Sequence, residues 1–210
     1  MGLTGIFISS FIIAFSGAMM PGPMFTATML MSSKRGFTSG PVIVMGHGTL
    51  EALLVILLYL GFGELLKDHM VMGSIGVIGG ITLLWMAYEA FGFSGNALTE
   101  NRGRLVNGSA YIAGILTSLS NPYWIIWWVT IGLSYIVLSF KYGIIGIVVF
   151  YTGHILADLV WYSIVALSFG YMKRFISSKG FRAITVISGI IFAGFSAYFV
   201  WYGINSLIKS

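Results

Sequence analysis

The sequence GHGTLE at residues 46–51 returns as GHILAD at residues 153–158, and this repetition indicates how the chain is built. In both motifs a histidine follows the glycine and stands four positions before a carboxylate, and each motif lies within an apolar stretch long enough to cross a bilayer. Inserting an ionisable side chain at the depth of the membrane core costs about 2.5–3.5 kcal/mol on insertion scales, so such a residue usually has a function. The two motifs therefore predict an internal duplication that builds one transport site from two related halves.

The composition is that of an integral membrane protein. Hydrophobic residues make up 58% of the 210 residues, charged residues only 8%, and the mean hydropathy is +0.95, whereas a soluble domain carries about a quarter charged residues. No cysteine is present, which excludes disulfide frameworks and cysteine-ligated metals. The net charge of +5 does not predict nucleic-acid binding, because the basic residues stand in short loops at the ends of apolar stretches, where they set orientation.

The hydropathy pattern predicts six membrane-spanning helices. A straight span needs about 20 apolar residues, and the first and fourth stretches are longer than that and contain proline. The longest polar interval, residues 92–107, separates the third stretch from the fourth. The six ranges are approximately 3–32, 41–62, 71–91, 109–139, 142–170 and 183–208.

The basic residues predict the orientation of these spans. The loops after the first, third and fifth spans hold most of the 11 lysines and arginines, and such an excess marks the cytoplasmic side. Both termini are then expected outside the cytoplasm of a multi-pass cell-membrane protein. Because each half holds three spans, the second half must enter the membrane the opposite way up. The expected fold is an all-α integral membrane protein, a single transmembrane domain over 1–210, with an inverted 3+3 repeat of 1–92 and 108–210.

Proline predicts that helices 1 and 4 are broken. Pro21-Gly22-Pro23 removes two backbone donors from the first span, and Asn121-Pro122 interrupts the fourth. Irregular backbone at membrane depth is tolerated where protein or a wet cavity covers it. The alternative for each break is a packing kink, but breaks in corresponding spans of an inverted repeat favour a binding site at the repeat interface. We therefore assign both breaks to substrate binding.

The two histidine–carboxylate pairs allow three interpretations. A spacing of four residues places His47 over Glu51, and His154 over Asp158, on one helix face each. The carboxylates could bind a substrate ammonium or a coupling proton, with the histidines as partners. The four side chains could instead ligate a divalent metal ion, since nitrogen and oxygen ligands suit zinc or manganese. In the third interpretation the pairs are structural and only hold the halves together.

Aromatic residues follow the second proline break. Tryptophan near a membrane surface is commonly an interfacial anchor, and a deeper position would make it a cavity wall or a gate. Separately, a run of glycines at 73–80 predicts a small-residue face for helix packing, which permits a homodimer but does not require one. The aromatic residues are Tyr123, Trp124, Trp127 and Trp128.

The chain resembles the lysine-exporter (LysE) type translocators, small six-span amino-acid exporters. The resemblance rests on Pro21-Gly22-Pro23, on the spacing from Lys34 to Gly46 that leads into the second span, and on Asn121-Pro122 with the tryptophans that follow. It implies an inverted three-plus-three repeat and efflux of an amino acid or similar small metabolite against proton entry. The two His–acid motifs look stronger here than in the family's common amino-acid exporters, and relatives of similar architecture move metal ions.

The sequence thus predicts a proton-coupled exporter with a midplane site between its halves and no cofactor. Its partners would be a small-molecule substrate and the lipid bilayer. The leading alternative is a divalent-cation exporter that uses the same four side chains as ligands. A passive channel is disfavoured because a central acidic pair favours binding over free flow. No protease, hydrolase or P-loop motif appears, so no enzyme is expected.

Overall fold

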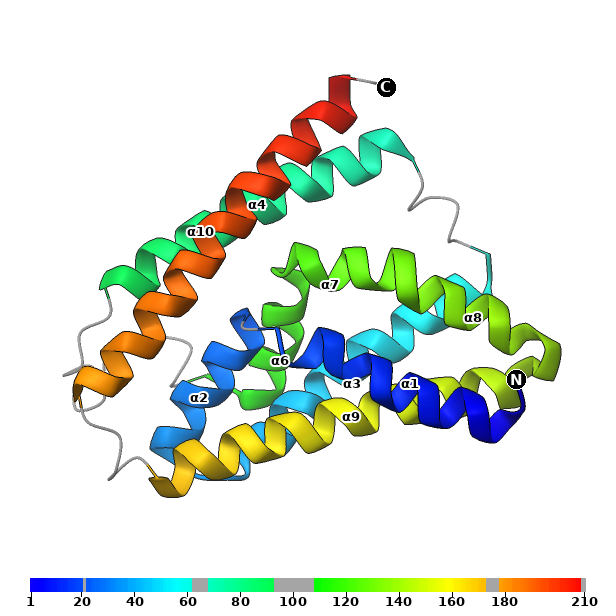
Figure 1. Ribbon diagram of the computed structural model, residues 1–210, viewed down its shortest axis with the longest axis horizontal. Helices are drawn as coiled ribbons and strands as arrows, with labels where there is room; N and C mark the ends of the chain where they lie inside the picture. Colours follow the sequence, from blue (N-terminus) through cyan, green and yellow to red (C-terminus); the bar gives the residue numbers. More distant parts are fainter. Residues whose placement is uncertain (21, 62–67, 93–107, 173–177, 209–210) are drawn as a thin grey trace.

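The structure is a computed structural model that describes residues 1–20, 22–61, 68–92, 108–172 and 178–208. Over these ranges the chain forms helices joined by turns, and no strand occurs in them (Figure 1). The expectation of an all-α protein is confirmed for this part of the chain. The elements are α1 (Leu3–Ala18), α2 (Pro23–Arg35), α3 (Ser39–Tyr59), α4 (His69–Gly92), α6 (Ala110–Leu119), α7 (Pro122–Trp127), the π-helical turn η3 (Trp128–Gly132), α8 (Leu133–Ser139), the 3₁₀ turn η4 (Phe140–Tyr142), α9 (Gly143–Met172) and α10 (Ser178–Ile208).

Several of these helices are long and apolar enough to cross a membrane. In the described ranges three stretches qualify by length and composition, and a bent pair, α1 with α2, raises the number to four. The longest of them, Tyr123–Tyr171, covers 49 residues and folds back at Gly143, where φ is 58°, so that α8 and α9 pack against each other (Figure 1). The apolar helices His69–Trp85 and Ala110–Leu119 are shorter. Six spans as an inverted repeat therefore stay a prediction.

The first predicted span consists of two helices at a steep angle. Helix α1 ends at Ala18, α2 begins at Pro23, and the two are bent by 81°. Proline is tolerated at the first position of a helix because that position needs no N–H donor. Pro21, the first proline of the predicted break, lies outside the described residues. Gly36 ends α2 with a φ of 86°.

The fourth predicted span is also divided. Helix α6 ends at Leu119, and α7 begins at Pro122. The side chain of Asn121 accepts a hydrogen bond from the backbone N–H of Tyr123 at 3.1 Å, which caps the new helix. Trp128 then opens the π-helical turn, a deviation that is frequent at functional sites.

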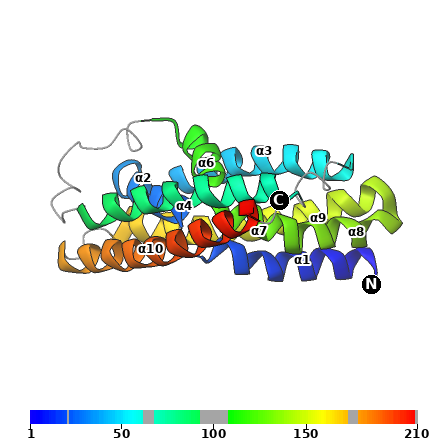
Figure 2. The same cartoon turned by 90° about the horizontal axis from the view of Figure 1, so that it is seen from above.

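Each half of the sequence packs its broken helix against the other half's motif helix. Helices α1 and α2 lie on α9, whereas α6 lies on α3 (Figure 2). The motif glycines allow these crossings. A Cβ atom on Gly46 would overlap the carbonyl oxygen of Tyr111 in α6, and one on Gly153 would come within 2.7 Å of the carbonyl oxygen of Phe7 in α1. The Tyr151 hydroxyl of α9 also donates to the carbonyl of Gly48 in α3 at 2.7 Å.

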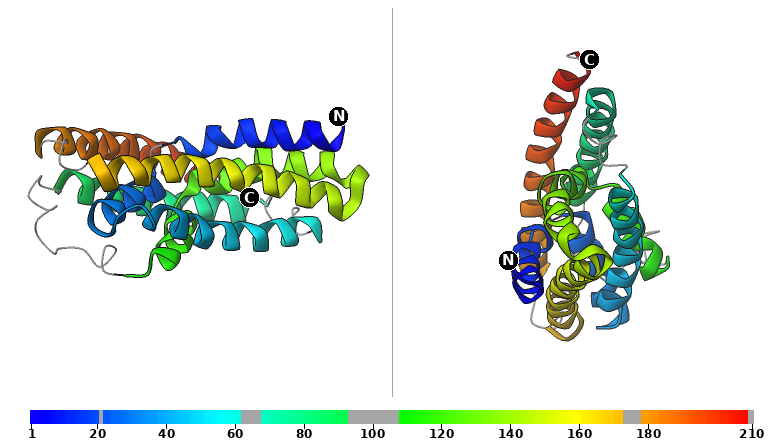
Figure 3. Two further views of the ribbon diagram at one scale, coloured as in Figure 1. Left: turned by 90° about the horizontal axis from the view of Figure 1, so that it is seen from below. Right: turned by 90° about the vertical axis from the view of Figure 1, so that its right-hand side faces the viewer.

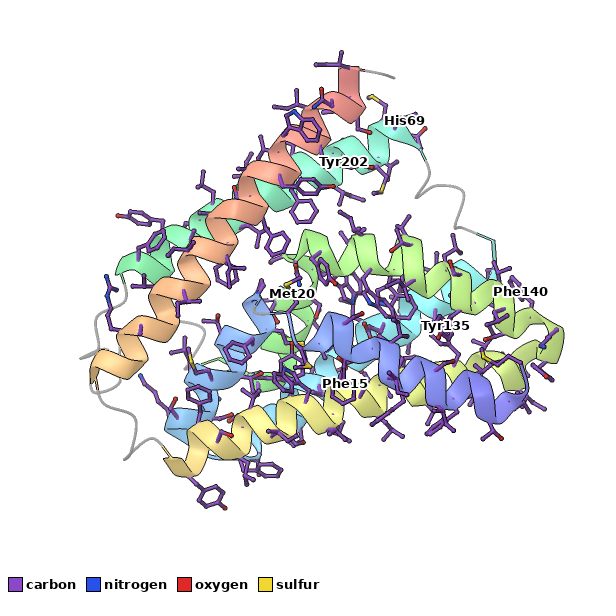
Figure 4. All side chains as sticks on the ribbon, in the orientation of Figure 1. Phe15, Met20, His69, Tyr135, Phe140 and Tyr202 are labelled. Atoms are coloured by element: carbon purple, nitrogen blue, oxygen red, sulfur yellow. The ribbon has the colours of Figure 1, made fainter. Side chains whose placement is uncertain are left out.

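Helices α4 and α10 form a separate pair along one edge of the molecule (Figures 1 and 3). A Cβ on Gly76 would lie 2.9 Å from the Cα of Gly203, and one on Gly80 would lie 2.9 Å from the backbone nitrogen of Val200. The predicted small-residue face is thus confirmed, and α10 covers it. Figure 4 places His69 of α4 and Tyr202 of α10 at the same end of this pair.

Candidate functional site

Four ionisable side chains from the two sequence motifs meet between α3 and α9. His47 Nε2 lies 3.1 Å from Glu51 Oε1 on its own helix and 3.8 Å from Asp158 Oδ2 on the other. His154 Nε2 lies 3.1 Å from Glu51 Oε2 and 3.5 Å from Asp158 Oδ2. All four residues are at most 6% exposed. Each histidine therefore contacts both carboxylates, and the cluster belongs to neither motif alone.

The position of the cluster follows from the helix crossings. In each motif the histidine and the acid stand four residues apart and so share a face, and the preceding glycine lets another helix approach. The face of α9 also carries Tyr162, four residues beyond Asp158. These crossings bring both motif faces to the same point of the bundle.

Ser118 is the hydrogen-bond partner of the Nδ1 atom of His47. The Ser118 hydroxyl donates to the carbonyl of Gly114 at 2.7 Å, one helical turn earlier, and its oxygen lies 2.6 Å from His47 Nδ1. When the single hydroxyl proton lies in the bond to Gly114, the Ser118 oxygen accepts the hydrogen bond from Nδ1–H. A neutral His47 then turns the lone pair of Nε2 towards Glu51 Oε1. Two acceptors would face each other at 3.1 Å, so this contact requires a proton on one of them.

Two tryptophans hold the carboxylate of Glu51. Trp124 Nε1 and Trp128 Nε1 both donate to Glu51 Oε1, at 2.8 and 2.9 Å. The π-helical turn begins at Trp128, and a Cβ on Gly132 would overlap the Trp128 ring, so this glycine leaves room for the indole. His154 packs against Trp127, with ring centroids 4.6 Å apart. The aromatic stretch after the second break therefore forms a wall of the cluster.

A small cavity of about 50 Å³ opens onto the cluster. By the usual allowance of about 10–15 Å³ per water it holds only a few water molecules. Asn121 borders it and also borders a second, smaller space beside Gly22 and Pro23. The described lining of the cavity on the cluster contains no lysine or arginine. It consists of Gly17, Ala18, Met24, His47, Glu51, Ser118, Asn121, Trp124, Trp127, His154, Asp158 and Tyr162.

The structure gathers most of the residues that the sequence proposed. One cavity is lined by five of the proposed residues: His47, Glu51, Asn121, His154 and Asp158. Gly22 and Pro23 instead line the smaller space that Asn121 also borders. Gly22 is a neighbour of Asn121, since a Cβ on Gly22 would lie 3.5 Å from Asn121 Nδ2. Pro122 contributes its backbone to the start of α7, and its side chain is outside the described part, as is all of Pro21.

The structure decides between the two interpretations that the sequence left open for the tryptophans. Interfacial anchoring is wrong for Trp127 and Trp128, which are 4% and 0% exposed, and the alternative of a cavity wall describes them better. Tyr162 and Met24 line the cavity and were not singled out. The four-residue spacing from Asp158 could have indicated Tyr162, because it lies on the same helix face. Nothing in the local sequence pointed to Met24.

A divalent metal ion is the alternative occupant of the cluster. His47, Glu51 and Asp158 each offer one ligand atom, and these atoms lie within 4.8 Å of one another. However, the Oε1 atom of Glu51 that faces His47 already accepts two indole N–H groups, whose positive ends repel a cation. The other oxygen, Glu51 Oε2, accepts neither indole N–H, so ligation there leaves those hydrogen bonds intact.

The comparison with family models decides the family. The model described as "LysE type translocator" matches residues 15–203. The chain belongs to the LysE type translocator family. One curated relative of this translocator is a protein of Bacillus subtilis (strain 168), named "Putative amino acid efflux protein YcgF", with 24% identity over 206 residues. The match covers 97% of the translocator and 99% of the relative. No solved structure matches.

Family membership and the apolar helices together establish the general class. The translocator is a multi-pass membrane protein of a transport family. The resemblance drawn from the proline motifs is thereby confirmed. The substrate, the coupling ion and the roles of single residues are inferred below from the geometry of the site.

Proposed function

We propose that this translocator exports an amino acid or a similar small metabolite in exchange for protons, at the cluster of His47, Glu51, His154 and Asp158. The observation that carries the proposal is the contact of His47 Nε2 with Glu51 Oε1, which needs a proton because Ser118 occupies the other ring nitrogen. A substrate ammonium can replace that proton, since both place a positive donor between the carboxylates. The efflux description of the relative supports the same direction of transport.

The proposal includes the architecture that would make alternating access possible. We infer six spans in two inverted halves, 1–92 and 108–210, with breaks caused by the proline motifs and both termini outside the cytoplasm. Support comes from the reciprocal packing of the broken helices on α3 and α9. In this arrangement the cluster lies near the midplane, where transporters built from inverted repeats place their sites. The polar interval at 93–107 that would join the halves is outside the described residues.

Flux measurements on proteoliposomes test the function. Vesicles are loaded with a mixture of amino acids or, separately, with divalent cations, and loss of each solute is followed with and without an imposed proton gradient. Gradient-dependent loss of an amino acid is the expected result. Loss of a metal ion alone would establish the cation-exporter alternative, and loss of neither class would contradict both.

Glu51→Gln tests the proton assignment in the same assay. Glutamine keeps an oxygen that can accept the indole N–H groups but cannot exchange a proton, so we expect the protein to fold and gradient-driven export to fall to background. Asp158→Asn should impair export to a comparable degree if the halves act equivalently. Wild-type proton coupling in Glu51→Gln would contradict the assignment of the exchanged proton to Glu51. Normal export by Asp158→Asn would show that the second carboxylate has a structural role.

A further inference from the structure

A third cavity, larger than the two described above, is bordered by Trp124 and Trp128. Its volume is about 220 Å³, and its surface is almost wholly apolar. It opens between α3, α4 and the start of α7. The main lining residues are Leu50, Leu53, Leu54 and Leu57 of α3, Ile75 of α4 and Trp124 of α7.

The side chain of Trp124 lies between this apolar cavity and the polar one. It lines both cavities, and its indole N–H donates to Glu51 at 2.8 Å. Trp128 also borders the apolar cavity while donating to the same oxygen, but its side chain is fully buried. Trp124 is less buried than Trp128. The indole of Trp124 thus separates a charged from an apolar space.

The volumes indicate what the two spaces can hold together. The polar cavity, at about 50 Å³, admits an ammonium group or a few waters but no complete amino acid. An apolar cavity of about 150 Å³ is sufficient to bind benzene, so about 220 Å³ accommodates a side chain as large as that of leucine or phenylalanine. Such a ligand would place its ammonium at Glu51 and Asp158 and its side chain beyond Trp124.

We propose that the apolar cavity is the side-chain subsite of the export site, and that the translocator selects amino acids with large apolar side chains. This inference rests on the proposed function. Trp124 is its specificity-determining residue, because its indole must turn away from Glu51 when the substrate's ammonium replaces the N–H donor. A lipid acyl chain is the competing occupant, since Leu53, Leu57 and Leu119 of the lining are 55%, 38% and 53% exposed. An acyl chain carries no cation, however, and has no group to place beside Glu51 and Asp158.

Wild-type selectivity is the first part of the test. Reconstituted protein is assayed for export of leucine and phenylalanine against alanine and glycine, and we expect a preference of roughly tenfold or more for the larger pair. Ligand-induced rises in the Tm of the purified protein give the same ranking without transport. Amino-acid export without a preference for large apolar side chains would overturn the subsite and leave the proposed function intact. Export of no amino acid would contradict the proposed function itself.

Cavity-filling variants are the second part. Leu53→Trp and Ile75→Trp fill the cavity from opposite walls, and each should reduce leucine export roughly tenfold more than it reduces alanine export. The matched controls are Ile56→Trp on α3 and Ile78→Trp on α4, which are 54% and 66% exposed and do not line the cavity. Equal loss for all substrates in the filled variants, with normal controls, would assign the cavity to lipid and overturn the proposal.

Discussion

At the scale of single residues, the oxygen Oε1 of Glu51 is where the site's interactions converge. It accepts two indole N–H groups and lies within 3.3 Å of a ring nitrogen from each histidine. In the described residues Glu51 Oε2 and Asp158 Oδ2 have histidine neighbours but no hydrogen bond of good geometry. A buried carboxylate oxygen without a hydrogen bond is costly. These two oxygens can accept an additional donor, such as a water molecule, a protonated histidine or an ammonium group.

Trp128→Phe tests the contribution of one indole donor. The ring is retained while the N–H···O bond to a carboxylate is lost, and such bonds contribute about 1.5–3 kcal/mol. We expect the free energy of unfolding in detergent to fall by that amount and export to weaken. The control is Trp201→Phe on α10, where the side chain is 64% exposed. An unchanged Tm in Trp128→Phe would show that the hydrogen bond to Glu51 is not stabilising.

Ser118→Ala tests the orientation of His47. Without the hydroxyl, Nδ1–H loses its acceptor and the imidazole is free to exchange tautomers, so proton-driven export should fall severalfold, and loss of the buried bond should cost about 1–3 kcal/mol of stability. Ser120→Ala is the matched control, because Ser120 donates to the carbonyl of Leu116 at 2.7 Å but is only half-buried. Equal behaviour of the two variants in export and in thermal unfolding would contradict the role of Ser118.

At the scale of helices, the sequence predicted the positions well and the packing partners only in part. The six expected ranges agree within a few residues with α1–α2, α3, α4, α6–α8, α9 and α10, because apolar length and proline are local signals. The pairing of the motifs was indicated by their repetition. The hydrogen bonds of Trp124 and Trp128 to Glu51 could not be predicted, since they depend on a π-helical turn and on Gly132, for which the sequence offers no local signature.

Gly46→Ala tests the crossing of α3 and α6. The added methyl group would overlap the Tyr111 carbonyl, so the helices must separate at a cost of about 1–3 kcal/mol, and the contact between His47 and Ser118 should be lost with them. A lower Tm and loss of export are expected. Gly194→Ala is the control, because no atom lies within 4 Å of a Cβ at that position and alanine favours the helix. A Tm for Gly46→Ala as high as that of Gly194→Ala would refute the close crossing.

At the scale of the whole molecule, the proposed inverted repeat makes a prediction about sidedness. The chain has no cysteine, so single cysteines can be introduced without a background. Thr38→Cys follows the first predicted span and Lys141→Cys the fourth, and both positions are exposed. A membrane-impermeant maleimide should label Lys141→Cys in intact cells and Thr38→Cys only after permeabilisation. Labelling of both from the same side would rule out the inverted arrangement.

The pairing of α4 with α10 has a consequence for biosynthesis. Among the described residues the glycine face of α4 packs against α10, and α10 begins at Ser178, long after α4 ends at Gly92. At about 5–20 residues per second, the ribosome needs roughly 4–17 s to reach the start of α10. During that interval α4 must wait at the insertion machinery or in lipid with its narrow face uncovered. Substitutions on this face should therefore act first on the yield of inserted protein, before any effect on transport is visible.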